Sequence, residues 1–531
     1  MRPSPTPLLD WRRAISCLHR WLGIAGGALF LLWFASGIVM VYARMPALDP
    51  AERLRRLPDL DLAAARVAPG EAARDLGLAP ERLRIAMLGD RPVYRFAERT
   101  TWVAVFADDG RPFGSLTAAA AARLARRLYP EHAATARHDR RLVAPDQWTL
   151  QSRSLLPAHR IALGDPEDTR VYISERTGEP VMSTTRRARR WAYAGPVPHW
   201  LYFTPLRSRG SLWNRAVIGL SLAGSVLAVS GLVSGVWQAI RARRSAAGAP
   251  LGSRIPSPYT GWMRWHHYAG LAFGLFTFTW VASGCLSMDP LAWHPGTEPT
   301  AVERDAVAGG PLRLDALTLD RLRAVHAALD GDLAVKELEL VQLRSEPFLL
   351  AYRPPAATPP RRGIGYDPSA FLSIVQPFEP RLVSALDPER GTFSRFDEDE
   401  VMAAARAAMP HARLVESTWL DAHDSYYYPR GVAAPLPVLR ARFDDPSRTW
   451  LYLDPGRGVL VRKEERLTRL NRWLYHGLHS LDFPFLRDRR PLRDAVVIAL
   501  CLGGILVAST SMADGWRRVG RHLRRLAPRG R

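Results

Sequence analysis

Four long apolar runs interrupt an otherwise polar chain, at about residues 22–42, 216–239, 268–288 and 495–513. Each run is roughly twenty residues long, which is enough for a helix to cross the hydrocarbon core of a bilayer. Because the mean hydropathy of the whole chain is only −0.12, most residues must lie outside the bilayer. The pattern predicts an α-helical membrane bundle of four transmembrane helices, with two large polar insertions.

The two insertions mix helical and strand patterns. Alternating β-branched and aromatic residues predict strands, and alanine-rich periodic stretches predict helices. We expect strands at 92–96, 101–106, 170–174, 438–443 and 450–454, helices at 62–76 (interrupted at Pro69-Gly70), 116–128 and 398–409, and proline-rich linkers at 295–299 and 354–360. Both insertions are therefore predicted to be α+β domains.

These patterns divide the chain into eight segments. We expect a cytoplasmic N-terminus with the first helix (1–44), an exported domain (45–211), the second helix (212–240), a cytoplasmic loop (241–262), the third helix (263–288), a second exported domain (289–490), the fourth helix (491–516) and a cytoplasmic basic tail (517–531).

The net charge of +22 is concentrated beside the predicted helices. Segments 1–20, 241–264 and 517–531 are rich in arginine, and their one acidic residue is Asp10. Short basic loops stay on the cytoplasmic side, so both termini are predicted to be cytoplasmic and both insertions to lie on the opposite side of the membrane. These arginines suit contact with the lipid bilayer. No nucleic-acid-binding motif accompanies them, so we expect no nucleic-acid partner.

The membrane part of the sequence is written twice. Segment 19–37 recurs without a gap as 266–284, and a second match aligns 169–224 with 449–504. Both copies begin on the predicted cytoplasmic side, so the bundle is expected to be internally duplicated about an axis along the membrane normal.

The two repeats pair His19 with His266 and His199 with His479. Two neutral imidazoles from facing helices complete the octahedral coordination of haem iron. Small residues at Gly23, Gly27, Gly270 and Gly274 would let a flat ring lie against the backbone. The chain has no C-x-x-C-H motif, so covalently attached haem is excluded. We therefore predict two haem b groups, each held by one of these histidine pairs.

Two neighbouring histidines leave the choice of ligands open. His267 follows His266 but points about 100° away from it on a helix, and His476 lies three residues before His479. The competing interpretation is that the histidines only anchor helix ends at the membrane interface. The remaining histidines show no pairing and are expected at the surface. An aromatic and basic cluster at 426–430 is expected to be either protein core or a ligand site.

These residues resemble the PepSY-associated transmembrane proteins. The resemblance is carried by His19-Arg-Trp-Leu-Gly, by the tryptophan-bearing helix that ends in Ala-Ser-Gly, by the Asp109-Gly110 turn and by Arg472-Trp-Leu-Tyr-His-Gly-Leu-His479. Members of this family include bacterial inner-membrane ferric-siderophore reductases with two b-type haems in a four-helix bundle. The resemblance implies PepSY-like periplasmic domains, an inner haem on His19 and His266, and an outer haem on His199 and His479.

The resulting expectation is an inner-membrane electron-transfer protein, an oxidoreductase that reduces a ferric siderophore or another ferric chelate in the periplasm. Reduction helps to release iron because hard oxygen ligands bind Fe(II) more weakly. The sequence has no glycine-rich nucleotide-binding motif, so a quinol or a separate reductase is the expected electron donor. The alternative is a haem-free scaffold or sensor that binds peptides or peptidases.

Overall fold

The computed structural model describes residues 11–98, 101–151, 153–245, 257–330, 334–354, 380–430 and 434–526. The chain divides into two compact units. Unit 1 lies within residues 1–44, 191–294 and 470–531, and unit 2 lies within 45–190 and 295–469. Unit 1 therefore holds the four apolar runs, and unit 2 holds most of the two polar insertions.

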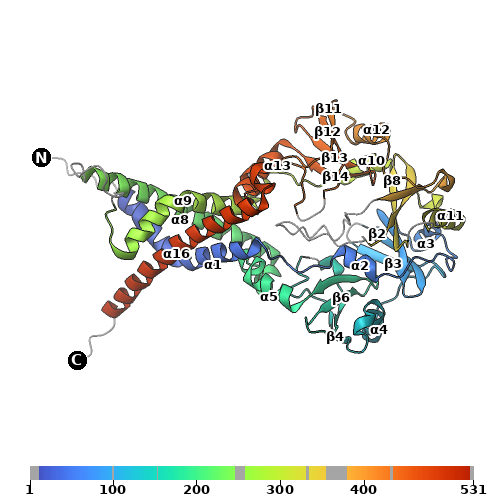
Figure 1. Ribbon diagram of the computed structural model, residues 1–531, viewed down its shortest axis with the longest axis horizontal. Helices are drawn as coiled ribbons and strands as arrows, with labels where there is room; N and C mark the ends of the chain where they lie inside the picture. Colours follow the sequence, from blue (N-terminus) through green and yellow to red (C-terminus); the bar gives the residue numbers. More distant parts are fainter. Residues whose placement is uncertain are drawn as a thin grey trace. The chain divides into compact units, whose positions relative to one another are not determined.

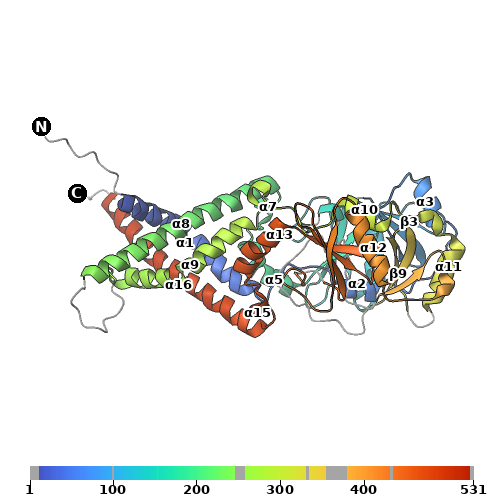
Figure 2. The same ribbon diagram turned by 90° about the horizontal axis from the view of Figure 1, so that it is seen from above.

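Four long helices form unit 1, namely α1 (Trp11–Met40), α8 (Gly210–Ser245), α9 (Gly261–Leu286) and α16 (Arg490–Leu526). All four are long and apolar enough to cross a membrane, which confirms the predicted transmembrane helices. The helices run side by side (Figures 1 and 2). Helix α1 packs against α8 and α16, and α9 packs against the same two helices. Helices α1 and α9 are therefore diagonal partners in the bundle.

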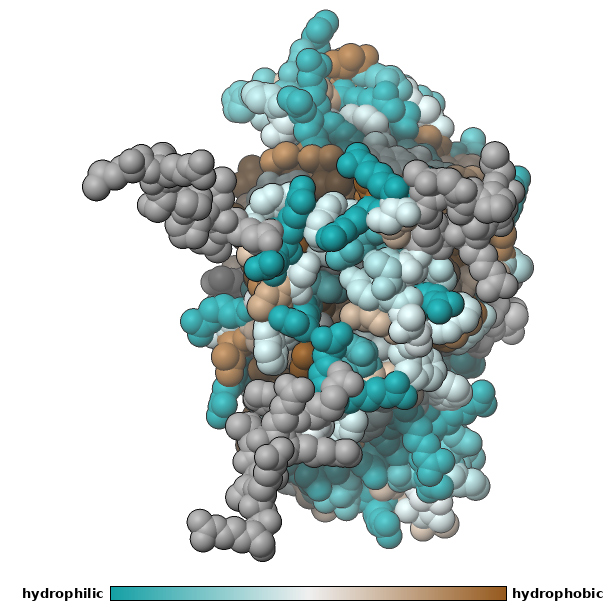
Figure 3. All heavy atoms as spheres, turned by 90° about the vertical axis from the view of Figure 1, so that its left-hand side faces the viewer, coloured by the Kyte–Doolittle hydropathy of each residue, from teal (hydrophilic) through white to brown (hydrophobic). Residues whose placement is uncertain are grey.

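Helices α1, α8 and α16 extend well beyond the apolar runs that predicted them, because arginine-containing turns continue each helix beyond the apolar residues. The last turn of α8, for example, contains Arg243 and Arg244. Figure 3 looks onto the end of the bundle where α1 begins, and hydrophilic side chains stand out there. Charged residues at the ends of an apolar helix are the arrangement expected of a multi-pass membrane protein.

Short helices precede α8 and α16. They are α6 (Pro196–His199) and α7 (Thr204–Arg207) before α8, and a π-helical turn (Arg472–Gly477), α14 (Leu478–Ser480) and α15 (Pro484–Arg487) before α16. Helix α6 packs against α1, and α14 packs against α9. Each short segment therefore places a histidine beside one of the two diagonal helices.

Aromatic side chains fill the centre of the bundle. Phe30, Phe34 and Trp280 are buried in one apolar cluster. Glycines make room for them: a Cβ atom added at Gly224 would lie 3.1 Å from the ring of Phe30, and one at Gly504 would lie 2.6 Å from the ring of Phe34. Close packing of this kind is how small residues contribute to helix association in membranes.

Unit 2 is built on a six-stranded antiparallel sheet with the order β10-β9-β8-β1-β2-β3. Its strands are β1 (Arg82–Leu88), β2 (Arg91–Glu98), β3 (Thr101–Phe106), β8 (Glu337–Leu343), β9 (Glu346–Tyr352) and β10 (Arg381–Ser384). The first three strands belong to the first insertion and the last three to the second. They join where β1 pairs with β8, with Ile85 opposite Leu338. The two insertions, which the sequence analysis treats as separate domains, thus share one sheet.

Two four-stranded antiparallel meanders complete the β-structure. One contains β4 (Arg137–Leu142), β5 (Ala158–Ala162), β6 (Arg170–Ser174) and β7 (Pro180–Thr184), and the other contains β11 (Leu414–Leu420), β12 (Val438–Phe443), β13 (Trp450–Asp454) and β14 (Val459–Glu464). Helices α4 (Ala118–Leu128) and α12 (Glu398–Ala408) pack on the respective sheets. The sequence spacing between β5 and β12, and between α4 and α12, equals that between His199 and His479.

The remaining helices are short. They are α2 (Pro50–Arg56), α3 (Pro69–Asp75), α5 (Arg186–Ala194), α10 (Ala301–Ala308), α11 (Leu319–Asp330) and α13 (Arg466–Asn471), with single 3₁₀ turns at Pro130–His132, Arg153–Leu155, Pro290–Ala292, Leu314–Ala316 and Pro388–Arg390.

Most of the predicted elements of unit 2 are confirmed, but the helix expected at 62–76 is wrong in its first half. Only Pro69–Asp75 is helical, because proline favours the first turn of a helix and restricts the residue before it to extended conformations. The linker at 295–299 is irregular as expected. In the second predicted linker, residues 355–360 lie outside the described residues.

A buried ion-pair network holds the junction between β1 and β8. Arg53 donates hydrogen bonds to both carboxylate oxygens of Glu337, at 2.7 and 3.0 Å, and to Glu179 at 3.0 Å. On the neighbouring pair of positions, Arg84 lies opposite Glu339. Burial alone would raise the pKa of Glu337, but the charges of Arg53 and Arg84 outweigh burial and hold that pKa below its ordinary value. Charges from both insertions therefore neutralise one another inside the sheet.

Candidate functional site: two histidine pairs in the helix bundle

The first histidine pair lies near the beginnings of α1 and α9. The ring centroids of His19 and His266 are 6.1 Å apart, and the planes of the rings differ by 32°. His19 Nδ1 donates to the carbonyl oxygen of Leu227 on α8 at 3.0 Å, and His266 Nδ1 donates to that of Val507 on α16 at 3.1 Å. The diagonal helices thus supply the imidazoles, and the other two helices orient them.

The second pair lies at the opposite ends of the same two helices. The ring centroids of His199 and His479 are also 6.1 Å apart. His199 Nδ1 donates to the carbonyl oxygen of Trp33 at 3.2 Å, and His479 Nδ1 donates to that of Trp280 at 3.0 Å. The hydroxyl oxygens of two serines lie 3.1 and 3.2 Å from these nitrogens, on Ser36 and Ser283 respectively. Here α6 and α14 supply the imidazoles, and α1 and α9 orient them.

In all four imidazoles, Nδ1 is the nitrogen that makes a hydrogen bond to a main-chain carbonyl oxygen. A carbonyl oxygen can only accept, so each Nδ1 carries the hydrogen and each Nε2 carries the lone pair of a neutral ring. Burial, followed by the neighbouring His479, lowers the pKa of His199 to about 3, so this ring stays neutral at physiological pH. A neutral imidazole fixed through Nδ1–H is the form in which histidine binds metals through Nε2.

The ring separation matches what two axial imidazoles require. A histidine nitrogen lies about 2 Å from a bound first-row metal, and each ring nitrogen lies about 1 Å from its own centroid. One metal held between two imidazoles therefore sets the two centroids roughly 6 Å apart. The separation of 6.1 Å in both pairs fits this arrangement.

Glycines let the rings approach the helix backbones closely. A Cβ atom at Gly231 would lie only 2.5 Å from Cε1 of His19. At the other level, a Cβ atom at Gly37 would lie 3.7 Å from Cε1 of His199, and one at Gly284 would lie 3.2 Å from Cε1 of His479. Side chains at Gly231 and Gly284 would crowd the rings, whereas a Cβ atom at Gly37 would make an ordinary contact, so one glycine at each level is required by a histidine ring.

A buried polar atom near the second pair also fits a bound group. The indole nitrogen of Trp280 is buried and has no hydrogen-bond partner among the described residues. Its main-chain carbonyl is the one that orients His479. A buried N–H without an acceptor is costly, and an acceptor from a ligand at this level would remove that cost. His199 and His479, the glycines beside them and this indole would together suit a planar cofactor held between the two imidazoles.

The four glycines proposed from the sequence to face that group mostly contact other helices instead. A Cβ atom at Gly23 would lie 3.5 Å from Ser511, one at Gly27 would lie 3.1 Å from Met512, and one at Gly274 would lie 2.8 Å from Leu232. Gly270 has no atom within 4 Å of such a Cβ. Three of the four therefore serve helix packing, whereas Gly231, which the repeat did not single out, lies against an imidazole.

The two alternative histidines have other surroundings. His267 donates through Nε2 to the carbonyl oxygen of Gly235 at 2.9 Å, and its Nδ1 lies 3.0 Å from the hydroxyl of Ser257. Both ring nitrogens are therefore occupied. The ring of His476 lies beside that of Tyr475 with a centroid distance of 4.6 Å and a tilt of 49°, while the ring contact with His199 is made by His479. The geometry thus favours His266 and His479 in the two pairs.

One histidine pair in unit 2 was missed by the sequence analysis, which expected both residues at the surface. His138 Nε2 lies 3.0 Å from His159 Nδ1, and His159 Nε2 donates to the carbonyl oxygen of Leu116 at 2.6 Å. His159 is only 2% exposed. The two lie on adjacent strands β4 and β5, whose pairing register could not be read from residue spacing alone. The tyrosines at 427 and 452 also stack in the core, with centroids 4.9 Å apart.

A site for a bare metal ion, unlike the two histidine pairs, needs several His, Cys, Asp or Glu side chains close together. Within the described ranges, no three His, Cys, Asp or Glu side chains gather closely enough to hold an ion. The bundle instead offers histidines in twos, which suits a metal whose other ligands come from its own macrocycle.

Comparison with known proteins identifies the family of this chain. A family model described as the PepSY-associated TM region matches residues 16–510, which include α8, α9, most of α1, the first part of α16 and all six candidate histidines. No curated protein sequence matches the chain. Because the family model covers most of the chain, this protein belongs to the PepSY-associated transmembrane family.

Proposed function

We propose that this protein is a bacterial inner-membrane electron-transfer protein that holds two b-type haems and reduces a ferric siderophore or a similar ferric chelate in the periplasm. The observation that carries the proposal is the geometry of the two histidine pairs. Both have ring centroids 6.1 Å apart, and in both the Nδ1 atoms are held by main-chain carbonyls.

In this proposal His19 and His266 hold one haem, and His199 and His479 hold the other. Haem bound at these positions would supply one-electron redox chemistry. The chain's own contribution is to keep four imidazoles neutral and correctly oriented. Carbonyl groups of Leu227 and Val507 orient the first pair, and a more basic imidazole results from each such hydrogen bond.

The two pairs lie at separate levels of the bundle. Fourteen residues separate His19 from Trp33, whose carbonyl orients His199. At 1.5 Å per helical residue, the two levels are about 21 Å apart along α1. This separation suits redox groups placed towards the two faces of a hydrocarbon core that is about 30 Å thick.

Charge supports the proposed orientation. The arginine-rich ends of the four helices would lie in the cytoplasm, and unit 2 would lie in the periplasm, as the positive-inside rule requires. We further propose that the two halves arose by internal duplication. Matched positions make matched contacts: the acceptors Leu227 and Val507 are separated by the same spacing as His199 and His479.

The ferric chelate and the electron donor are the parts of the proposal that rest on family resemblance. A quinol or a separate reductase would deliver electrons at the cytoplasmic side, and the ferric chelate would be reduced in the periplasm. Fe(II) is then released more readily because oxygen chelators hold it more weakly.

The proposal is tested by following electrons to a ferric chelate. The purified full-length protein in nanodiscs is reduced with dithionite, freed of excess reductant and mixed with ferrioxamine and a chromophoric Fe(II) chelator. We expect stoichiometric Fe(II) production in the wild type and in His267→Ala, and its loss in His479→Ala. A coloured protein that never transfers electrons would contradict the reductase function. A colourless protein would favour the haem-free scaffold or sensor.

A further inference from the structure

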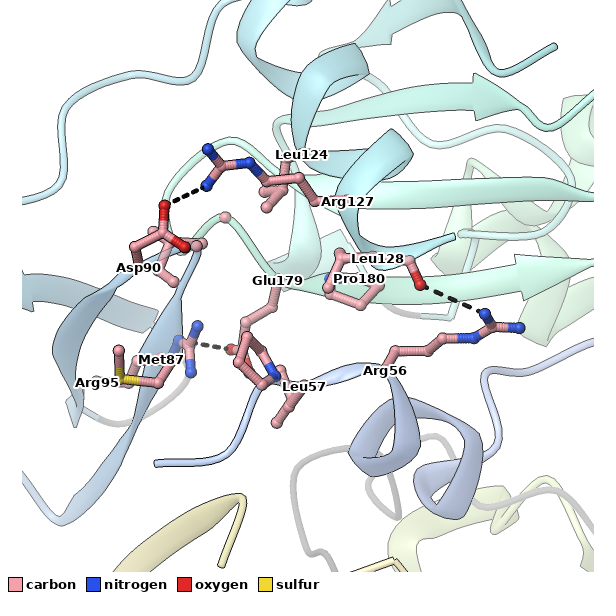
Figure 4. Close-up of a pocket in the computed structure, with 14 residues that line it drawn as sticks. Arg56, Leu57, Met87, Asp90, Arg95, Leu124, Arg127, Leu128, Glu179 and Pro180 are labelled. Carbon is pink, nitrogen blue, oxygen red and sulfur yellow. Dashed lines mark hydrogen bonds and ion pairs between the residues drawn. The ribbon is translucent and has the colours of Figure 1, made fainter. Parts of the chain in front are cut away.

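A cavity of about 390 Å³ opens in unit 2, within the part built by the first insertion (Figure 4). Its walls come from the end of α2, the turn between β1 and β2, helix α4 and the turn between β6 and β7. Volumes of this size are typical of small-molecule sites. The cavity contains none of the four paired histidines, so it is independent of the function proposed above.

Arg95 is the decisive residue of this cavity. It is only 1% exposed, yet two of its guanidinium nitrogens, Nε and Nη1, have no hydrogen-bond partner among the described residues. The nearest carboxylate oxygen, on Glu179, lies 3.4 Å from Nε, and Glu179 already accepts a hydrogen bond from Arg53 at 3.0 Å. A buried guanidinium with unused N–H groups is costly unless an acceptor reaches it.

The rest of the lining carries paired charges at the mouth and is apolar along one wall. Arg127 forms an ion pair with Asp90 at 3.0 Å, and Arg56 forms one with Glu131 at 2.6 Å and donates to the carbonyl oxygen of Leu128 at 3.4 Å. Figure 4 shows the contacts with Asp90 and Leu128. The apolar wall is made by Leu57, Leu124, Leu128, Met87 and Pro180. A ligand that fits must therefore combine a negative charge with an apolar body.

The second insertion shows that the fold does not need this arginine. Arg95 on β2 lies opposite Arg84 on β1, and the corresponding residue on β9, Leu350, lies opposite Glu339 on β8. Leu350 is 1% exposed and packs in an apolar core with Phe348 and Phe396. One insertion thus closes the position with leucine, whereas the other keeps a charged residue beside an open cavity.

From these observations we propose that the cavity binds a small monocarboxylate with an aromatic or aliphatic body. The carboxylate would accept hydrogen bonds from Arg95, whose planar guanidinium suits a carboxylate, and the body would lie against Leu124 and Leu57. Asp90 and Glu179 also line the cavity. They would repel a second negative charge, so a monoanion fits better than a phosphate.

The test compares a carboxylate with its uncharged amide. Calorimetry on the full-length protein in nanodiscs, with empty nanodiscs as the blank, measures binding of phenylacetate and hexanoate and of the two corresponding amides. We expect saturable binding of at least one carboxylate, at least tenfold tighter than its amide. Equal binding of acid and amide, or no saturable binding of either acid, would overturn the proposal and leave a cavity that holds only water.

Three variants locate the binding. Arg95→Leu, which introduces the residue found at position 350, should abolish the preference for the carboxylate. Leu124→Phe fills the cavity without changing any charge, and should weaken binding of the carboxylate at least tenfold even if the arginine variant fails to fold. Arg74→Ala removes an exposed arginine elsewhere in unit 2 and should change nothing. Retained preference in Arg95→Leu, or full binding in Leu124→Phe, would contradict the assignment.

Discussion

The two halves of the chain use different side-chain contacts to hold the start of a long helix, α8 in the first half and α16 in the second. In the first half, the rings of Tyr202 and Trp213 meet with centroids 5.1 Å apart, and Trp213 Nε1 donates to the carbonyl oxygen of Trp200 at 2.9 Å. At the matching positions of the second half, Asp482 and Arg493 form an ion pair at 2.8 Å. The donor role of Trp213 passes to Arg493, which donates to the carbonyl oxygen of Ser480 at 2.8 Å.

What both halves retain is a donor that ties the start of the long helix to the turn carrying the histidine. Tryptophan and arginine both supply an N–H group on a long side chain. The contact that differs, aromatic in one half and ionic in the other, decides only how the donor is supported. By the same reasoning, the imidazoles and their carbonyl acceptors, which are alike in both halves, mark what each half must provide.

The two insertions also differ in the charges that they contribute to the sheet of unit 2. The first insertion places Arg82 and Arg84 on β1, and the second places Glu337 and Glu339 on β8. If both strands carried the same sign, their pairing would bury like charges. The complementary signs instead favour the pairing of one insertion with the other.

Among the variants proposed here, removing Arg53 from the buried ion-pair network should have the largest effect on stability. Arg53→Ala leaves Glu337, which is fully buried, without its main partner. Losing one partner of a buried pair typically costs about 3–5 kcal/mol. We expect such a decrease in the free energy of unfolding, measured by denaturant titration of the full chain.

The matched control is Arg74→Ala. Arg74 pairs with Asp315 on the surface, where both side chains are largely exposed. Exposed pairs contribute about 0–1 kcal/mol. Similar losses in the two arginine variants would show that the network at the β1–β8 junction does not hold the two insertions together.

Adding a single methyl group at position 231 should disturb the first histidine pair and leave the second pair intact. Gly231→Ala places a Cβ atom 2.5 Å from His19, a separation that real side chains do not tolerate without a shift of the ring. We expect the haem content per chain to fall by roughly half, because only the first pair is disturbed. Haem and protein are quantified on the same preparation.

Gly219→Ala serves as the control for this variant, since Gly219 lies at an exposed position of the same helix and nothing lies within 4 Å of its added Cβ atom. It should keep the wild-type haem content. Equal losses in both glycine variants would point to general damage to the bundle rather than to displacement of one imidazole.

Exchanging the supporting contacts between the halves should have a smaller effect. Asp482→Ala removes the buried partner of Arg493 and should lower the free energy of unfolding by about 1–3 kcal/mol. Introducing the aromatic pair of the first half, Asp482→Tyr with Arg493→Trp, should restore part of that loss. No recovery in the double variant would mean that the two contacts are not interchangeable. Both values come from the same unfolding titration.

The smallest effect is expected for Trp213→Phe. This change removes the indole N–H that donates to Trp200 but keeps an aromatic ring against Tyr202. Loss of one hydrogen bond typically costs about 0.5–1.5 kcal/mol. A thermal unfolding midpoint equal to that of the wild type would show that this tie does not stabilise the helix start.

The sequence predicts the membrane part of the fold well because long apolar runs have few alternatives to a spanning helix. The repeat also predicts which histidines should meet, since equivalent positions converge about an internal axis. The acceptors of their hydrogen bonds are main-chain carbonyls, such as that of Leu227. A carbonyl is present at every residue, so residue types alone do not identify it.

The arrangement of unit 2 was harder to predict, because strand pairing between β1 and β8 joins residues about 250 positions apart. Local patterns locate strands but do not say which strands are neighbours. The pairing of His138 with His159 depends on the same kind of information. The cavity at Arg95 also follows from tertiary packing, since an arginine within a strand pattern is usually exposed.

The most direct test of the account is the haem content of the full-length protein purified from haem-sufficient cells. Absorbance spectra and haem-to-protein ratios are compared for the wild type, His19→Ala, His199→Ala and His267→Ala. The account predicts a b-type spectrum with two haems per chain in the wild type and in His267→Ala, and about half that content in each of the other variants. A colourless wild type, or unchanged haem in His19→Ala and His199→Ala, would contradict it.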